Sequence, residues 1–178
     1  TKLFLVVIII LCFNLCFSQT VSLDESFGTG GKTSKRFPGF ETGIFSSKIQ
    51  PDGKIVVCGF RNQSFNFQSA GIIIGRYNSN GIIDLDFGTN GFVILDDLFI
   101  DGTANKMLLL QSNGKILITG SKLGSTNFDF HTYRFNSNGT LDSTFGNNGE
   151  VVTDINNSLD ESTTLIELPD GKIVVLGT

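Results

Sequence analysis

The 178-residue chain has few of the residues on which disulfide-rich, nucleic-acid-binding or histidine-dependent proteins rely. It contains three cysteines and one histidine, and its formal net charge is −4. Cys12 and Cys16 fall within the first 18 residues, so only Cys58 remains beyond them. A disulfide framework is therefore excluded for the rest of the chain. The acidic balance also excludes a basic footprint for nucleic acid.

Catalytic motifs are missing as well. Because His131 is the only histidine, no serine or cysteine nucleophile can be paired with a histidine base from the sequence. Helical periodicity is almost absent, so no glycine-rich loop leads from a strand into a helix as nucleotide binding would need. A glycosidase-type pair of carboxylates needs no local motif, but no two acids stand out as such a pair.

The apolar run at the start of the chain is too short for a membrane span. It covers about 15 residues after Lys2 and contains Asn14, whereas a spanning helix needs roughly 18 to 20. The run ends in Cys-Phe-Ser before Gln19, which predicts a secretory signal peptide over residues 1–18, with an uncleaved anchor as the alternative. We expect cleavage near Ser18 and Gln19, a secreted or cell-surface protein, and no transmembrane span in the mature chain.

A repeated motif dominates the rest of the sequence. Leu/Ile-Asp-x-x-Phe-Gly-x-x-Gly occurs at residues 23–31, 83–91 and 141–149, with its phenylalanines 60 and 58 residues apart. A period of this length predicts tandem repeats that stack or form a circle. The expected organisation is a signal peptide (residues 1–18), two full repeats and a shorter third. The repeats are residues 19–82, 83–140 and 141–178.

Each period also carries a hairpin signal. Asp-Gly-Lys or Asn-Gly-Lys at residues 52–54, 113–115 and 170–172 favours a tight turn between two strands. The unbroken apolar run that follows each turn predicts a strand buried on both faces. The predicted strands are residues 43–50, 55–59, 72–77, 92–95, 104–111, 116–120, 130–135, 162–168 and 173–177. Four short antiparallel strands per period are typical of a β-propeller blade.

Together with Arg-Tyr/Phe-Asn-Ser-Asn-Gly at residues 76–81 and 134–139, these motifs make residues 23–178 resemble the delta-60 repeat family of secreted bacterial proteins. The resemblance implies a propeller-like fold and brings no established activity. Residues 23–178 hold about 2.6 periods, whereas closed propellers have about four to eight blades. We therefore expect an all-β, partial β-propeller of tandem four-stranded repeats that belongs to a larger protein, with further repeats of that protein as neighbours.

Most of the prominent polar residues recur with the repeat, which favours a structural role. Asp24, Asp84 and Asp142 precede the Phe-Gly turns, where an Asx side chain accepts from the amide two residues on. Arg76 and Arg134 each stand eight residues before one of these acids. This spacing predicts an ion pair, with a substrate-binding role as the alternative. The structural motif positions are Asp24, Phe27, Gly28, Asp84, Phe87, Gly88, Asp142, Phe145, Gly146, Gly53, Gly114 and Gly171.

Two acidic groups make calcium an alternative to a protein without a cofactor. Asp84 and Asp86 share one loop, and Asp96, Asp97 and Asp101 form another oxygen-rich stretch. Carboxylate oxygens suit a hard cation, but neither stretch has the full ligand loop with its distal acid.

Aromatic and amide side chains lie together in two expected loops. They are Phe65, Asn66, Phe67, Asn127 and Phe128, which either hold a sugar or peptide or cap the blade edges. We expect a non-enzymatic extracellular scaffold for binding or adhesion to glycan or protein. One alternative is the front part of a secreted polysaccharide hydrolase or lyase, and another is a structural stalk. No catalytic residue is singled out.

Overall fold

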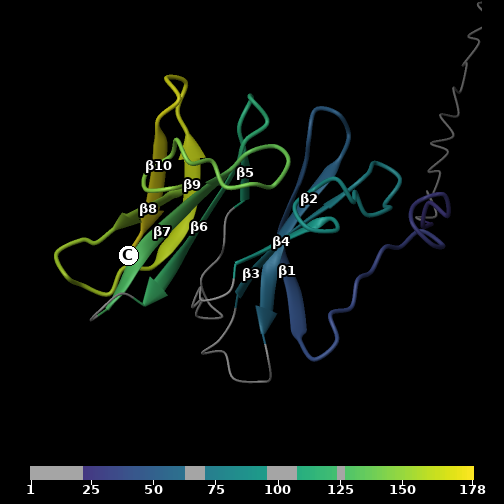
Figure 1. Cartoon of the computed structure of the whole chain (residues 1–178), viewed down its shortest axis with the longest axis horizontal. Coiled ribbons are helices and arrows are strands. Elements are labelled where there is room, and N and C mark those ends of the chain that lie inside the picture. Colours follow the sequence, from purple (N-terminus) through teal and green to yellow (C-terminus); the bar gives the residue numbers. More distant parts are fainter. Residues whose placement is uncertain (1–21, 63–70, 96–107, 124–126) are drawn as a thin grey trace, which may run out of the picture.

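The computed structural model describes residues 22–62, 71–95, 108–123 and 127–178. Within these ranges the chain forms strands and turns, arranged as three antiparallel sheets side by side (Figure 1). None of the described residues forms a helix that is long and apolar enough to cross a membrane. The predicted all-β class with four-stranded antiparallel repeats is therefore confirmed.

The strands follow one another in sequence order within each sheet. The first sheet contains β1 (Glu41–Ile49), β2 (Ile55–Asn62), β3 (Gly71–Tyr77) and β4 (Phe92–Leu95). The second contains β5 (Leu108–Leu110), β6 (Ile116–Leu123), β7 (Phe128–Phe135) and β8 (Glu150–Thr153). The third contains β9 (Ser162–Glu167) and β10 (Ile173–Gly177). Eight of the nine predicted strands lie within a few residues of these bounds, and the predicted strand 104–111 is described only from residue 108.

The sheets and the sequence periods are out of phase. The second and third Phe-Gly motifs each lie between the third and fourth strands of a sheet, so the sequence boundaries 82/83 and 140/141 fall inside the first and second sheets. The fourth strand nevertheless pairs with the third, as in the register Gly75 to Phe92 and Tyr133 to Glu150. Each of these two sheets is thus completed by a strand from the following sequence period.

The hairpin turns form as the Asp-Gly and Asn-Gly signals predict. In the first sheet the N–H of Gln50 donates to the carbonyl of Lys54 at 2.7 Å, and the N–H of Gly53 donates to that of Gln50 at 2.9 Å. Gly53 has φ of +83°, and the corresponding Gly114 and Gly171 have +82° and +81°. Glycine is required here because other residues seldom adopt positive φ.

The core lies between the first and second sheets. Ile116 and Ile118 of the second sheet are fully buried against Val56 and Cys58 of the first. Leu117, on the opposite face of β6, is also fully buried, so β6 is covered on both faces as its unbroken apolar run predicts. The complete core cluster is Val56, Cys58, Ile72, Ile74, Phe87, Leu108, Ile116, Ile118, Tyr133 and Phe135.

The prediction of two buried faces holds less well for β2. Val56 and Cys58 are fully buried, whereas Ile55 and Val57 on the other face are only half-buried. The reason is tertiary, because no described sheet covers that face of the first sheet.

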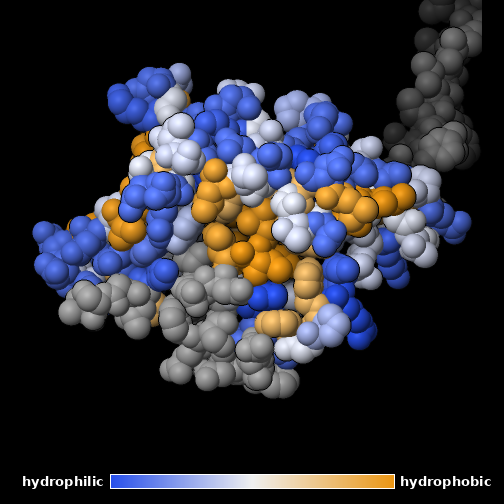
Figure 2. Space-filling model, in the orientation of Figure 1, coloured by the Kyte–Doolittle hydropathy of each residue, from blue (hydrophilic) through white to orange (hydrophobic). Residues whose placement is uncertain are grey.

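The connections at the two ends of the strands differ. We call the strand ends that carry the hairpins 50–54, 111–115 and 168–172 the turn edge, and the strand ends where β2 and β6 lead into β3 and β7 the loop edge. Hydrophilic side chains cover the turn edge, at the top of the view, and apolar side chains gather in the middle (Figure 2).

Candidate functional site

An Arg–Asp–Lys clamp lies in the first sheet near its turn edge. Arg76 Nε and Lys54 Nζ donate to Asp84 Oδ2 at 2.7 and 2.9 Å. The other oxygen, Oδ1, accepts from the N–H of Asp86 at 3.3 Å, and the Arg76 guanidinium lies 4.7 Å from the Phe87 ring centre. Burial opposes ionisation of Asp84, but the bond from Lys54 and the charge of Arg76 outweigh it and lower the pKa of the carboxyl.

The second sheet repeats this clamp with the same geometry. Arg134 Nε and Lys115 Nζ donate to Asp142 Oδ2 at 2.7 and 2.5 Å, and Arg134 lies 4.5 Å from the ring centre of Phe145. Asp142 Oδ1 accepts from the N–H and hydroxyl of Thr144 at 3.1 and 2.7 Å. The bonds from Lys115 and Thr144 hold the pKa of Asp142 well below its usual range.

The clamp joins sheets as well as strands. The Arg76 guanidinium also donates to the carbonyl of Ser137 in the second sheet. Because both oxygens of Asp84 already accept hydrogen bonds from protein groups, the arrangement favours the structural role of this acid over calcium binding. Asp86, the second calcium candidate of this loop, is exposed, and the remaining candidates Asp96, Asp97 and Asp101 lie outside the described residues.

The first two Phe-Gly motifs each attach their turn to the sheet that follows. The N–H of Gly88 donates to the carbonyl of Asn138 at 2.8 Å, and that of Gly28 donates to Asn80 at 2.7 Å. Gly28, Gly88 and Gly146 all have positive φ, between +53° and +59°. Phe87 is completely buried beside this contact. These motif residues therefore build the joints between sheets.

One polar cluster occurs in a single repeat. Glu150 Oε1 contacts His131 Nδ1 at 2.5 Å and accepts from the hydroxyl of Tyr133. Burial, together with the neighbouring Glu150, raises the pKa of Tyr133. Burial also opposes ionisation of Glu150, but the bonds from Tyr133 and His131 outweigh it and lower the pKa of that acid.

Sequence reasoning missed Tyr133 and Glu150. A signal was available in the sequence, because alignment of the two repeats places Glu150 and His131 at the positions of Phe92 and Ile73. Two polar residues thus replace two apolar ones. Tyr133 belongs to the core cluster and His131 is buried. The three groups satisfy one another within the packed joint between sheets.

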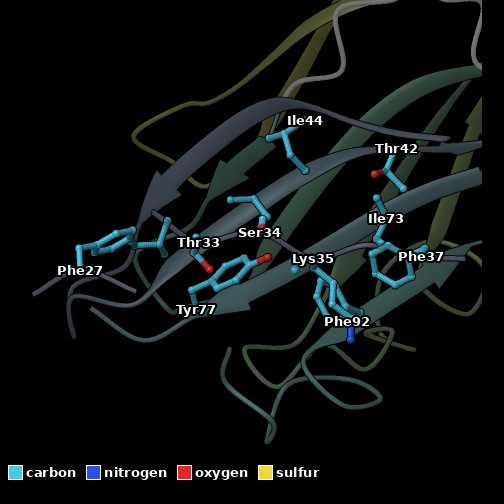
Figure 3. Close-up of a pocket in the computed structure, with 13 residues that line it drawn as sticks. Phe27, Thr33, Ser34, Lys35, Phe37, Thr42, Ile44, Ile73, Tyr77 and Phe92 are labelled. Carbon is cyan, nitrogen blue, oxygen red and sulfur yellow. The ribbon is translucent and has the colours of Figure 1, made fainter. Parts of the chain in front are cut away.

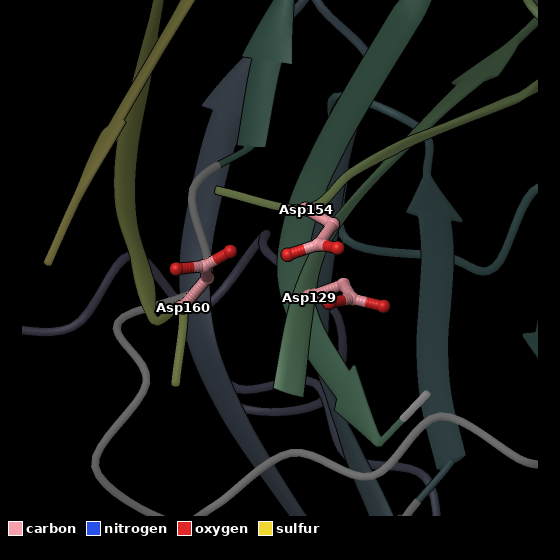
Figure 4. Close-up of side chains that lie close together, drawn as sticks. All are labelled: Asp129, Asp154 and Asp160. Carbon is pink, nitrogen blue, oxygen red and sulfur yellow. The ribbon is translucent and has the colours of Figure 1, made fainter. Parts of the chain in front are cut away.

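Three carboxylates from separate segments converge at the loop edge (Figure 4). Asp129, Asp154 and Asp160 each place an oxygen within 4.8 Å of the others. Asp160 is buried and accepts from the N–H of Ile155 at 2.6 Å and from the hydroxyl of Ser158 at 2.7 Å. Asp160 thereby holds the connection between β8 and β9 in place. No sequence motif contains all three acids, which explains why they were not predicted.

Two of the predicted binding residues lie at this same edge. Asn127 Nδ2 donates to the carbonyl of Ser158, and the carbonyl of Phe128 accepts from the N–H of Asp160 at 2.8 Å. Both residues are half-buried. The bond from Asn127 supports the alternative role of capping a blade edge. Phe65, Asn66 and Phe67 lie outside the described residues.

An apolar cavity of about 300 Å³ lies on the uncovered face of the first sheet (Figure 3). Ile55, Val57 and Tyr77 of the sheet line it, and Phe27 and Phe37 of the preceding segment close its ends. The remaining lining residues are Thr33, Ser34, Lys35, Thr42, Ile44, Ile73, Gly75 and Phe92. The sequence did not predict this cavity, because the pattern of apolar residues does not reveal which face lacks a neighbour.

Comparison with known families supports the propeller fold. Residues 50–87 and 111–145 match a family model described as a domain of unknown function (DUF5122) beta-propeller. Both segments run from a hairpin turn to the phenylalanine of the next Phe-Gly motif, so they are the same part of two successive repeats. No curated protein and no solved structure gave a match.

These two segments are therefore similar to a β-propeller repeat whose family model describes no function. The narrower resemblance to delta-60 repeats stays a prediction.

Proposed function

We propose that this protein is a secreted, non-enzymatic repeat scaffold that binds an extracellular glycan or protein through its loop edge. The observation that carries the proposal is the difference between the two edges of the sheets. Residues that recur in the repeats join the strands and sheets near the turn edge, whereas the connections at the loop edge differ from one repeat to the next.

At the turn edge the repeated groups already have partners within the protein. The Arg–Asp–Lys clamps, the hairpin turns and the Phe-Gly motifs use their hydrogen bonds to hold neighbouring strands and sheets together. Groups engaged in this way have little capacity left for a ligand. Their recurrence in successive repeats agrees with a framework role.

At the loop edge the chain differs in both length and composition. Residues 63–70 connect β2 to β3, whereas residues 124–127 make the corresponding connection in the second sheet. Loops that vary on a rigid framework are where binding residues are usually found. The carboxylates of Asp129 and Asp154 and the ring of Phe128 lie at this edge, and they offer acceptors and an apolar surface to a sugar or a peptide.

No specific observation favours the hydrolase or lyase alternative. The cluster of His131, Tyr133 and Glu150, which is not repeated, packs in the joint between two sheets. The alternative is nevertheless tested by the same experiment when the polysaccharides are analysed for reaction products after incubation with the protein.

The experiment measures binding of residues 19–178 to a panel of bacterial and host polysaccharides and extracellular proteins. The test variant is Asp154→Asn at the loop edge, and the matched control is Asp52→Asn at the turn edge. Both acids are exposed, and each accepts a backbone N–H that asparagine can also accept. We expect Asp154→Asn to change the affinity for the bound ligand at least about threefold, and Asp52→Asn to leave it unchanged.

The outcomes separate the three hypotheses. A ligand that binds and is released chemically unchanged supports the scaffold hypothesis. Conversion of a polysaccharide into products overturns that hypothesis in favour of an enzyme. No binding to any member of the panel indicates a stalk. Secretion is tested separately by expressing residues 1–178 in a bacterial host and sequencing the exported protein, which should begin at Gln19.

A further inference from the structure

Oxygen-bearing side chains alternate along the connection between β8 and β9. Residues 154–160 read Asp-Ile-Asn-Asn-Ser-Leu-Asp, with an oxygen ligand at every second position. Calcium-binding loops begin in this way, with oxygen side chains at positions 1, 3 and 5, and continue with glycine at position 6 and glutamate at position 12. Here Leu159 and Leu165 hold the last two positions, and Asn156 and Asn157 turn the chain with φ of +60° and +53°. The connection therefore supplies only part of a cation site, and further ligands have to come from elsewhere in the fold.

The fold brings a third acid, Asp129, to this connection. Asp154 directly follows β8, one position beyond the last residue pair of β7 and β8, and the N–H of Asp160 donates to the carbonyl of Phe128 in β7. Figure 4 shows the three carboxylates together, with those of Asp154 and Asp160 pointing toward one another. Each places an oxygen within 4.8 Å of the others. Oxygens bound to one calcium ion at about 2.3–2.6 Å lie no more than about 5 Å apart, so all three acids can reach one ion.

A second observation is that Asp129 has a carboxylate oxygen buried without a partner. Its Oδ1 is shielded from solvent and accepts no hydrogen bond within the described part of the chain. Lys122 lies opposite Asp129 in the register of β6 and β7, on the same face of the sheet. Among the described residues, however, no lysine or arginine forms an ion pair with any of the three acids. A buried carboxylate oxygen without a donor is costly, and a bound cation would remove that cost.

The hydrogen-bond partners of the other two acids carry no charge. Asp160 is 2% exposed and accepts from the N–H of Ile155 and the hydroxyl of Ser158. Asp154 Oδ1 accepts from the N–H of Asn157 at 2.8 Å. These neutral donors orient the carboxylates without cancelling their charge, whereas the acid of each Arg–Asp–Lys clamp binds two cationic side chains. Carboxylates this close to one another repel, most strongly where water is excluded, so the cluster favours a positive charge among them.

We propose that Asp129, Asp154 and Asp160 bind a calcium ion at the loop edge. Ligands that are all oxygen suit a hard cation and not zinc. Calcium is favoured over magnesium because it accepts several protein oxygens in irregular geometry, whereas magnesium demands an octahedron and keeps most of its water. Asn156, at the third position of the loop pattern, and water complete the coordination. The ion ties the start of β7 to the connection between β8 and β9 and so fixes the loop edge.

The test measures calcium binding to residues 19–178 by isothermal titration calorimetry, after metal ions have been removed with a chelating resin. We expect one ion per chain, with a Kd of about 0.1–1 mM, as in other extracellular calcium modules. Asp129→Asn and Asp154→Asn should each weaken binding at least about tenfold, because each removes a charged ligand. Asp86→Asn is the matched control, because it also removes one acidic charge, from an exposed residue outside the cluster, and its Kd should equal that of the unmodified chain.

Thermal unfolding separates an ion site from a purely structural role of Asp129. In the presence of a chelator, Asp129→Asn removes one of three repelling charges, so its midpoint should equal or exceed that of the unmodified chain. Addition of about 10 mM calcium should raise the midpoint of the unmodified chain by about 3–8 °C and leave that of Asp129→Asn in place. A side chain that merely holds the fold together would instead lower the midpoint equally with and without calcium when replaced.

Three results would overturn the proposal. They are an unmodified chain that binds no calcium up to about 10 mM, a Kd that survives either Asp129→Asn or Asp154→Asn, and magnesium binding as tight as that of calcium. Circular dichroism checks the folding of every variant. The probe is the calcium ion alone, so this proposal does not depend on the glycan or protein ligand proposed above. A failed calcium titration leaves that ligand to be tested, and the absence of a ligand leaves the ion site to stand on its own titration.

Discussion

The N–H of Gly88 donates a 2.8 Å hydrogen bond to the carbonyl oxygen of Asn138, and this bond ties a turn of the first sheet to a turn of the second. Gly88 has φ of +53°, and a Cβ atom on it would lie 2.3 Å from the carbonyl oxygen of Phe92. Its neighbour Phe87 is completely buried in the joint. The most regular motif of the sequence is therefore the part of the molecule that connects one sheet with the next.

Replacing Phe87 by alanine should destabilise the protein strongly. The ring is fully buried in the core cluster, and truncation of such a ring costs about 3–5 kcal/mol. The control is Phe145→Ala, which removes the half-buried counterpart in the next motif and should cost clearly less. Urea unfolding of both variants checks the difference, and equal losses of stability would contradict the joint described for Phe87.

The cost of alanine at three glycines should follow their backbone geometry. In Gly114→Ala the alanine has to adopt φ of +82°, and its Cβ atom would lie 3.5 Å from the side chain of Ser137 without a clash. We therefore expect the free energy of unfolding to fall by about 1–2 kcal/mol from the left-handed backbone alone. Gly88→Ala should cost more, because the methyl group would also clash with backbone. Gly120→Ala, with ordinary φ and open space, should be close to neutral. Thermal or urea unfolding ranks the three, and a different order would contradict these geometries.

Acid should weaken the clamps. The pKa values of Asp84 and Asp142 are lowered in the folded protein from the ordinary value of 3.8. A lowered pKa means that the clamps stabilise the protein fully at pH values above about 4 and lose that contribution as the pH falls below it. Urea midpoints measured between pH 7 and pH 3 should therefore decrease on acidification. In Asp142→Asn the urea midpoint at neutral pH should be lower, and the midpoint should fall less between pH 7 and pH 3. A fall as large as that of the unmodified protein would mean that other acids govern the pH dependence.

Glu150→Gln should make Tyr133 easier to ionise. Burial of Tyr133 raises its pKa first, and the hydrogen bond and charge of Glu150 raise it further. Removing the charge leaves the burial effect and a neutral hydrogen-bond acceptor, so the pKa of Tyr133 should fall while remaining above the usual value of 10.0. An ultraviolet titration in the Tyr77→Phe background isolates this group, because the chain has two tyrosines. A titration curve that does not move would contradict the contact between Tyr133 and Glu150.

Much of the fold is predictable because its signals are local. Asp-Gly and Asn-Gly pairs set the turns, apolar runs set β2, β6 and β10, and the Phe-Gly period indicates tandem sheets. The position of β4 shows where this reasoning ends. Its residues directly follow the second motif, yet they pair with β3 of the preceding period. Pairing depends on which strand edge is unoccupied, and a periodic sequence does not contain that information.

The candidate sites were less predictable. The pairing of Arg76 with Asp84 is foreseeable because both residues recur at one spacing. The convergence of Asp129, Asp154 and Asp160 is not, because the three acids come from different segments and share no motif. The cluster of His131, Tyr133 and Glu150 depends on register, since only the pairing of β7 with β8 sets Tyr133 opposite Glu150.

Local chemistry alone decides that this chain forms short antiparallel strands, tight glycine turns and repeated polar clamps, because each depends on residues close together in sequence or at a constant spacing. Tertiary structure decides which faces are buried. Ile55 and Ile116 hold the same position in their repeats, but Ile116 is sealed against a neighbouring sheet and Ile55 lines an open cavity. Burial depends on what lies across the face, and that is a property of the packed sheets and not of the strand.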